Sequence, residues 1–479
     1  MKNILDFYID NNLFSDLDID AAVSRLSQAL QCRTINYADH SKTDFNEFAK
    51  LHELIKSSFK NLLNNSSFKV IGNKAVLIKI SGSDKSLKPC LLMAHQDVVP
   101  VVKGTENDWE HDAFSGFVDG EYIWGRGALD IKQMLFGILE ACDYLIAHNF
   151  KFKRDVYLAF GDDEETLNLG AEAIAKFLKS QGVELEFVLD EGGGVIESGA
   201  EFGADDNIYI SKINLAEKGY ADLELSVESA GGHSSRPMGI INGTSLEILS
   251  RAIAAICDAN LNYNLSNLNN LNDLFIKSFG LLSNYITQEP LKSLVKNNNI
   301  EELARYCLEQ PGLFPYIATT SAATMIEGGS AACNVMPQNM RAVINFRLNQ
   351  ADNIDALLTR AESALQNLNL HNDIKLRYLQ ANNPSNTASY DSYGYKALVK
   401  SLNNFYKDVI FIPSLTVGAT DAHCYEIICE NCLRCSPFMS DYNDARIGVH
   451  GTNERILIKT YIQGIKVLID FIINTCVNI

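Results

Sequence analysis

The sequence predicts an α/β fold, in which a mostly parallel sheet is covered by helices on both faces and a smaller α+β domain is inserted into the larger one. Short apolar runs alternate with helical patterns between residues 68 and 190, as is typical of a parallel sheet. After residue 219, apolar and polar residues alternate, which favours a sheet with one face in water. From about residue 383 the pattern of the first part returns.

The first part of the chain contains the expected elements in this order. Apolar residues at three- and four-residue spacing predict helices at 19–26 and 48–59. Residues 75–80 predict a strand, and the short apolar run at 89–94 is typical of a central strand that is buried on both faces. The elements expected next are a helix at 131–148, a strand at 156–160, a helix at 171–179 and a strand at 187–189.

The change of pattern predicts a domain boundary near Lys218. Strands of alternating character are expected at 221–227, 341–348 and 374–378, with a long, mostly helical stretch between the first two. The final helix is expected at 456–473 and belongs to the resumed first domain. We therefore expect one domain at 1–217 and 383–479 and an inserted lid or dimerisation domain at 218–382.

The composition bears on the partners, the compartment and the disulfide content that we expect for this protein. The 479 residues include 41 Lys and Arg against 59 Asp and Glu, a net charge of −18, which disfavours a nucleic-acid partner. We expect neither a membrane span nor a signal peptide, because no long uncharged apolar run occurs and the start is acidic. The 11 cysteines fit reduced thiols without a structural disulfide. A cytoplasmic protein is expected.

A histidine and an aspartate follow the expected central strand. His95 and Asp97 are two positions apart, so their side chains point to the same face of a strand. In an open parallel sheet, ligands bind outside the carboxyl ends of the strands. His95 is therefore a candidate metal ligand and Asp97 a candidate carboxylate that orients its ring. An ordinary surface His/Asp pair is the alternative.

Acidic residues also occur at three further positions that follow an expected strand or precede an expected helix. Asp130 lies between a glycine-rich turn and a helix, residues 162–165 are four carboxylates after a strand, and Asp190-Glu191 follow the strand at 187–189. Each has a simple alternative explanation, a helix N-cap for Asp130 and solvated loops for the others. One shared cation site at the edge of the sheet explains all of them together with His95.

Charge favours two divalent cations at that site. Carboxylates of Asp130, Glu165 and Asp190 with two neutral imidazoles leave an excess of positive charge that can activate a water molecule. We assign the second imidazole to His450, which precedes the last expected helix; an ordinary surface histidine is the alternative. Imidazole with carboxylate suits zinc, and Mn²⁺ or Co²⁺ can occupy the same ligands.

These segments as a set resemble the M20 metallopeptidase family, most closely its carboxypeptidase S-like and N-acyl-amino-acid-hydrolase branch. The match spans most of the chain in the order of the family. The segments that carry it are residues 92–100, 125–130, 163–165, 189–193, 232–235 and 449–451.

The resemblance implies a role for each residue of the centre. His95 and Asp190 would hold one zinc, Glu165 and His450 the other, and Asp130 would bridge the two. Glu164 would be the general base that takes a proton from the attacking water and delivers it to the leaving amine. Asp97 would support His95.

The resemblance also implies residues that contact the substrate. His233, in a glycine turn of the inserted domain, would donate to the oxyanion, often from the neighbouring subunit in this family, although an enlarged lid could deliver it within one chain. Arg347 would bind the substrate carboxylate with its guanidinium fork. Asn334 would make a polar contact nearby. Ordinary structural histidine and surface arginine residues are the alternatives.

Four cysteines offer a competing motif. Cys424, Cys429, Cys432 and Cys435 partly match an iron–sulfur spacing. Tyr425, Cys429 and Cys432 also share one helical stripe, so core packing is the preferred explanation.

The sequence therefore predicts a metallocarboxypeptidase-like amidohydrolase with two divalent metal ions. It would release a C-terminal amino acid from short peptides or N-acyl amino acids, and a homodimer through the lid domain is one arrangement that the family allows. An aminoacylase or dipeptidase of the same chemistry is one alternative. A non-catalytic, metal-free binding protein of the same fold is another.

Overall fold

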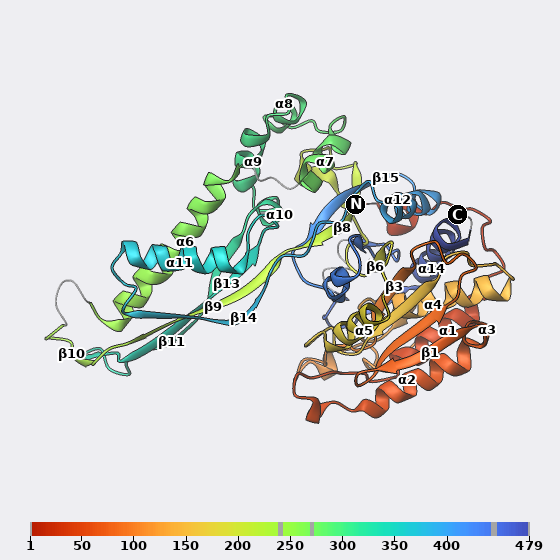
Figure 1. Cartoon of the computed structure of the whole chain (residues 1–479), viewed down its shortest axis with the longest axis horizontal. Coiled ribbons are helices and arrows are strands. Elements are labelled where there is room, and N and C mark those ends of the chain that lie inside the picture. The colour runs from red at the N-terminus through yellow and green to blue at the C-terminus, as the bar shows by residue number, and fades with distance from the viewer. Residues whose placement is uncertain (1, 238–242, 269–272, 442–447, 478–479) are drawn as a thin grey trace.

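The structure is a computed structural model that describes residues 2–237, 243–268, 273–441 and 448–477. It has a large α/β lobe and an elongated arm (Figure 1). The described parts of both chain ends lie in the large lobe.

A mixed ten-stranded sheet forms the centre of the large lobe, and its middle strands β5, β3, β6 and β16 run parallel. The strands expected at 75–80, 89–94, 156–160 and 187–189 are all present. In spatial order the sheet comprises β1 (Ser66–Ile71), β2 (Ala75–Ile80), β5 (Val156–Gly161), β3 (Cys90–His95), β6 (Val188–Asp190), β16 (Cys432–Arg434), β8 (Tyr209–Glu217), β7 (Val195–Ser198) and β17 (Ser440–Asp441), with β15 (Val409–Thr416) paired to β8.

Helices cover both faces of this sheet. Leu92 and Ala94 of β3 pack into a core with helices α4 (Lys132–Ala147) and α14 (Ile458–Ile472). Leu91 and Met93, which alternate with them, pack on the other face with α5 (Leu169–Ser180). Every residue of β3 is buried, so the apolar run correctly predicted a doubly covered central strand. The structure also describes the α-helices α1 (Ile19–Leu30), α2 (Phe45–Ser58), α3 (Lys60–Asn64) and α12 (Tyr393–Phe405) in this lobe.

One helical stretch is long and apolar enough to cross a membrane, Ile458–Val477, which contains α14. The structure places 78% of its most apolar window inside the protein, and α14 packs against α4 and α12. It is a core helix of the large lobe.

The arm is built on a four-stranded antiparallel sheet. Its order is β11 (Thr320–Gly328), β13 (Asn339–Leu348), β9 (Gly219–Glu228) and β14 (Ile374–Asn382). Helices α6 (Ser245–Ser266) and α11 (Ile354–Asn367) cover one face. The other face carries ion pairs, such as Glu224 with Arg341 and Arg377, as expected for a sheet with one wet face.

Two features of the inserted segment differ from the expectation. Strand β11 lies within the stretch predicted as helical; it is an edge strand with most residues exposed, so it has no apolar alternation to reveal it. Helix α7 (Asp273–Leu282) lies in the segment 218–382 that was expected to form the inserted domain, but it packs on β15 of the large lobe. The other helices of this segment are α8 (Leu291–Lys296), α9 (Ile300–Leu308) and α10 (Phe314–Ile317).

Two short pairs of strands complete the molecule. Strand β4 (Tyr122–Trp124) pairs with β18 (Arg455–Leu457) in the large lobe. Strand β10 (Gly232–His233) pairs with β12 (Val335–Met336) at the far end of the arm (Figure 1).

Candidate metal centre

The carboxyl ends of the parallel strands bring the predicted residues together. Strand β3 ends at His95, β5 ends just before the acidic loop 162–165, and β6 ends at Asp190. Asp130 reaches the same place from the loop before α4, and His450 from the loop before β18. The strand ends of a parallel sheet share one edge, so separate segments supply one site.

Asp130 stands between the two histidines. Its Oδ1 lies 3.0 Å from Nε2 of His95, and its Oδ2 lies 3.1 Å from Nε2 of His450. Each histidine has a further carboxylate: Glu191 Oε1 is 3.4 Å from Nε2 of His95, and Glu165 Oε1 is 3.0 Å from Nε2 of His450. Two groups of possible ligands therefore share one aspartate.

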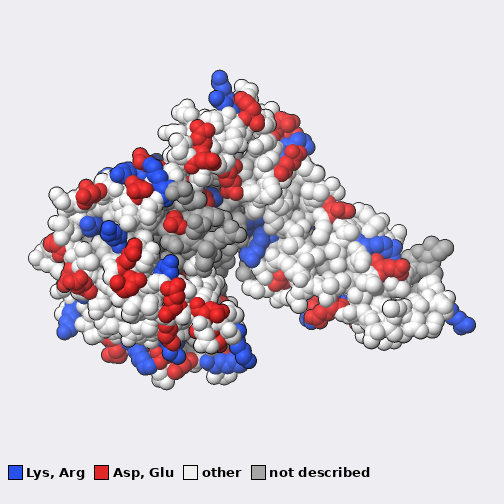
Figure 2. Space-filling view, turned by 180° about the vertical axis from the view of Figure 1, so that it is seen from behind, with Lys and Arg blue, Asp and Glu red and all other residues white. Residues whose placement is uncertain are grey.

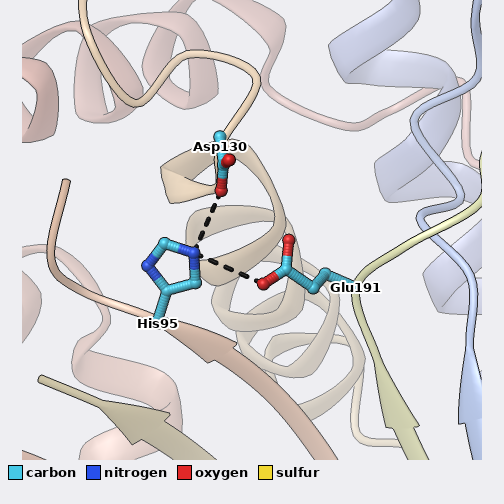
Figure 3. A group of neighbouring side chains, drawn as sticks. All are labelled: His95, Asp130 and Glu191. Carbon is cyan, nitrogen blue, oxygen red and sulfur yellow. Dashed lines mark hydrogen bonds and ion pairs between the residues drawn. The ribbon is translucent and has the colours of Figure 1, made fainter. Parts of the chain in front are cut away.

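The carboxylate beside His95 belongs to Glu191, where the sequence had predicted Asp190 (Figure 3). Asp190 is still inside β6, with Arg434 of β16 as its register partner, and it is absent from the three candidate ligand groups among the described residues. Glu191 lies just beyond the end of β6, and its side chain reaches His95. In this geometry Glu191, and not Asp190, belongs to the candidate ligand group with His95 and Asp130, and the role of Asp190 stays a prediction.

Asp97 fixes both His95 and the acidic loop. Its main-chain oxygen lies 2.9 Å from Nδ1 of His95. Its two carboxylate oxygens accept the backbone N–H groups of Glu164 and Glu165, each at 3.1 Å. Asp97 is fully buried. This contact orients the imidazole so that Nε2 faces Asp130 and Glu191.

Glu164 lies next to the centre from the same loop. Its Oε2 is 4.0 Å from Nε2 of His95, and one candidate ligand group contains His95, Glu164 and Glu165. Burial, followed by repulsion from Glu191, raises the pKa of Glu164 well above its usual value. The side chain is in place to accept a proton at the edge of the cluster.

The remaining charges show that the donor set suits a cation. Burial and the charge of Asp130 raise the pKa of Glu191 to about 8. Hydrogen bonds with Asp130 and Glu165 raise the pKa of His450 to about 10. Burial lowers the pKa of His95. The charge of Glu191 and the hydrogen bond with Asp130 have a larger, opposite effect, so the pKa lies well above its usual value. Carboxylates and imidazoles packed this closely form a donor set that suits a divalent cation.

Two cavities that share lining residues lie near the centre. One of about 210 Å³ is lined by Asp130, Glu191 and the glycines 192–194. The other, of about 410 Å³, shares Gly192 and Gly193 with it and extends to Tyr316 and Val417. Concave, largely apolar surfaces next to a few polar groups are typical of ligand sites.

Arg347 contacts Val417, a residue that lines the larger cavity. It is near the end of β13, where the arm joins the large lobe, and its Nη1 donates to the main-chain oxygen of Val417 at 3.5 Å. Its guanidinium also lies over the ring of Tyr220, 4.6 Å from the centroid. The structure thus places this arginine next to a lining residue of the cavity that shares Gly192 and Gly193 with the one beside Asp130 and Glu191.

His233 and Asn334 lie together but away from the centre. His233 is exposed, and its Nδ1 accepts the backbone N–H of Ser235 at 3.1 Å. The main-chain oxygen of Asn334 accepts from Ser234 at 2.9 Å. Both belong to the β10–β12 end of the arm (Figure 1). The structure does not bring them to His95, because the length of the arm separates them.

The four cysteines near residue 430 do not form a ligand group. None of the three candidate metal-binding groups in the described parts of the chain contains a cysteine. Cys429, Cys432 and Cys435 are buried in the apolar cores, as packing of small apolar side chains predicts.

Arg126 and Glu454 were missed by the sequence analysis. They form a buried ion pair with 2.6 Å between Nη1 and Oε2. The available signal was that each charge stands four residues from a predicted ligand, Arg126 before Asp130 and Glu454 after His450.

Comparison with curated proteins gives similarity along nearly the whole chain. A probable carboxypeptidase S-like protein 2 of Dictyostelium discoideum is 31% identical over 466 residues, which cover 95% of this chain and 84% of that protein. The N-fatty-acyl-amino acid synthase/hydrolase PM20D1 of Mus musculus is 30% identical, with 96% and 89% covered. Carboxypeptidase S of Saccharomyces cerevisiae is 27% identical, with 97% and 86% covered.

Solved structures share the fold. The M20 family metallo-carboxypeptidase Sso-CP2 of Sulfolobus solfataricus has a TM-score of 0.65 at 20% identity, over 94% of this chain and 98% of that one. Human carnosine dipeptidase 1 has a TM-score of 0.61 at 17% identity, over 96% of each chain. The model of peptidase family M20/M25/M40 matches residues 91–474. The chain therefore belongs to this family and is a carboxypeptidase-like hydrolase of peptide or amide bonds.

Proposed function

We propose that the chain is a two-metal amidohydrolase that releases a C-terminal amino acid from short peptides or N-acyl amino acids. The observation that carries the proposal is the position of Asp130, whose two oxygens face two different histidines. One cation would be held by His95, Asp130 and Glu191, and the other by Asp130, Glu165 and His450. Imidazole and carboxylate donors favour zinc, with Mn²⁺ or Co²⁺ as alternatives.

Glu164 is the proposed general base. Bound divalent cations would polarise the scissile carbonyl and lower the pKa of the attacking water. Glu164 takes the proton of that water as its oxygen bonds to the carbonyl carbon. It then delivers the proton to the amide nitrogen as the carbon–nitrogen bond breaks. Its buried position next to His95 and the raised pKa favour proton uptake.

Arg347 is the proposed anchor for the free carboxylate of the substrate. A guanidinium binds a carboxylate through two parallel hydrogen bonds, and this one contacts Val417, which lines the larger cavity. Relatives are named as carboxypeptidases and as an N-fatty-acyl-amino acid hydrolase, both of which have substrates with this group. An aminoacylase or a dipeptidase of the same chemistry remains the second candidate, since both also act on such substrates.

The direct test of the base replaces Glu164 with glutamine. Glu164→Gln keeps the size of the side chain but cannot accept the proton, so we expect bound metal to remain and kcat to fall by about 10²- to 10⁴-fold. Glu172→Gln, at an exposed ion pair on α5, is the matched control and keeps wild-type kcat. A Glu164→Gln enzyme with near-native kcat would show that another group takes the proton.

A substrate panel separates the candidate activities. Dipeptides, longer peptides and N-acyl amino acids, each with a free or an amidated C-terminus, are offered to the metal-loaded enzyme. We expect hydrolysis only with a free carboxylate, and the ranking of the acyl groups separates carboxypeptidase, dipeptidase and aminoacylase. No hydrolysis, together with less than one bound metal per chain, favours the non-catalytic binding protein.

We also propose a homodimer that forms through the arm, and a location in the cytoplasm. The edge strand β11 is exposed, with Met325 51% and Ile326 57% accessible, and unpaired edge strands invite pairing.

The eleven free cysteines fit a reducing compartment. Lys and Arg side chains are scattered among Asp and Glu over the face in Figure 2, which supports a small substrate and disfavours nucleic acid or a membrane as partner.

A further inference from the structure

A buried ion pair lies directly behind the metal centre. Arg126 and Glu454 have 2% and 0% of their surfaces exposed, and Nη1 of Arg126 donates to Oε2 of Glu454 at 2.6 Å. Arg126 follows β4, and Glu454 immediately precedes β18, which pairs with β4. The pair therefore joins the two chain segments that supply Asp130 and His450.

Glu454 holds the segment that ends at Asp130. Its Oε1 accepts the backbone N–H groups of Gly127 at 3.0 Å, Leu129 at 2.7 Å and Asp130 at 3.2 Å. Three donors converging on one oxygen fix the course of the backbone through this turn. The position of the Asp130 carboxylate follows from that course.

Arg126 holds the segment that carries His450. Its Nη2 donates to the main-chain oxygens of His450 at 3.3 Å and Gly451 at 3.0 Å. His450 has a φ of +58°, a left-handed conformation that costs energy for a residue with a side chain. The contacts with Arg126 help to maintain this conformation, in which the imidazole faces Asp130 and Glu165.

We infer that Arg126 and Glu454 are positioning residues that keep Asp130 and His450 in the relative placement that the second cation requires. The inference rests on the proposed two-metal centre. Neither residue is in a candidate ligand group; both act through the backbone of residues that are. The geometry assigns them different effects, since Glu454 contacts the Asp130 segment and Arg126 the His450 segment.

Arg126→Met separates the two effects. It leaves the Glu454 carboxylate to accept the three N–H groups, but it removes both contacts to the His450 segment. In a titration of the metal-free chain with Co²⁺, followed by visible absorption and calorimetry, we expect the first ion to bind as in the wild type. The second ion should bind about 10- to 100-fold more weakly.

Glu454→Gln affects both ions. Whichever way the amide is turned, its NH₂ group faces either Arg126 or the three backbone donors, so one set of contacts is lost. Because Asp130 belongs to both ligand groups, we expect weaker binding of both ions and a changed cobalt spectrum. Arg126→Lys keeps the charge but not the fork, and it provides a milder variant should Arg126→Met fail to fold; it should weaken the second ion by a smaller factor.

A partly buried ion pair outside the candidate ligand groups provides the control. Arg25 donates to Glu140 through two contacts of 2.5 and 2.6 Å, and neither residue is in a candidate ligand group. Arg25→Met should lower the unfolding midpoint but leave both Co²⁺ affinities unchanged. Wild-type affinities in Arg126→Lys and Glu454→Gln, or equal losses in Arg25→Met, overturn the positioning role. Fewer than two ions in the wild type instead overturns the proposed centre on which it rests.

Discussion

At Asp190 and Glu191, the sequence does not reveal which of two adjacent carboxylates reaches His95. Both follow the same apolar run, and only the point where the strand ends decides which of them faces His95. Asp190 remains in β6 next to Arg434, whereas Glu191 lies beyond it and reaches His95. The sequence has no signal for the last residue of a three-residue strand.

The other central residues were predictable because each has a distinctive neighbourhood. His95 and Asp97 end an apolar run, and Asp130 and His450 lie in glycine-rich turns. The structure brings these four to one place. Arg126 and Glu454 act through backbone contacts, and the sequence shows them only as charges four residues from Asp130 and His450.

Lys218 gives a prediction of pH dependence at the residue scale. It is 4% exposed between β8 and β9, and its Nζ donates to the main-chain oxygens of Pro315 at 2.9 Å and Ala318 at 2.7 Å. Burial and the charge of Arg347 lower its pKa from 10.5 to about 7. Between pH 7 and 10 the unfolded chain therefore binds more protons at this group than the folded chain.

Lys218 therefore increases the free energy of unfolding as the pH rises, by roughly 1 kcal/mol per pH unit between pH 7 and 10. Lys218→Met removes this term. We expect the stability of Lys218→Met relative to the wild type to be highest near pH 6 and to fall steadily towards pH 9. Denaturant unfolding of both proteins at several pH values measures the difference; a difference that does not vary with pH contradicts the lowered pKa.

At the scale of elements, the strands of the sheet centre were the most predictable. Strand β3 is buried on both faces, and its uninterrupted apolar run has no other simple explanation. Strand β9 has the opposite character, with alternate residues in the core of the arm, and the sequence showed that alternation.

Edge elements were less predictable for a physical reason. Strand β11 is exposed on both faces over most of its length, so burial imposes no pattern on its residues. Its place is set by pairing with β13, which is a contact between distant parts of the chain. Pairing of this kind is decided by the tertiary fold and not by local preference.

At the scale of the whole molecule, the position of the arm decides how His233 can reach the candidate metal centre. Figure 2 shows a hollow between the arm and the large lobe, and His233 lies at the outer end of the arm (Figure 1). If His233 donates to the oxyanion, either the arm closes or the arm of a second chain supplies the residue. The sequence contains the histidine and its glycine turn but no record of this geometry.

Mixing two inactive variants distinguishes these arrangements. His233→Ala and Glu164→Gln are each expected to have low activity. If His233 acts across subunits, dimers that contain one copy of each have one complete site. Co-refolding the two in equal amounts should then restore about a quarter of wild-type activity. A mixture that stays as inactive as its components shows that His233 acts within its own chain.

The central proposal is that Asp130 would hold two cations, one together with His95 and Glu191 and the other together with Glu165 and His450. Equilibrium titration of the metal-free chain with zinc, in the wild type and in the matched variants Glu191→Gln and Asp190→Asn, tests it most directly. We predict two tightly bound ions in the wild type and in Asp190→Asn, and only one in Glu191→Gln. Two ions in Glu191→Gln with a loss in Asp190→Asn, or fewer than two in the wild type, would contradict the claim.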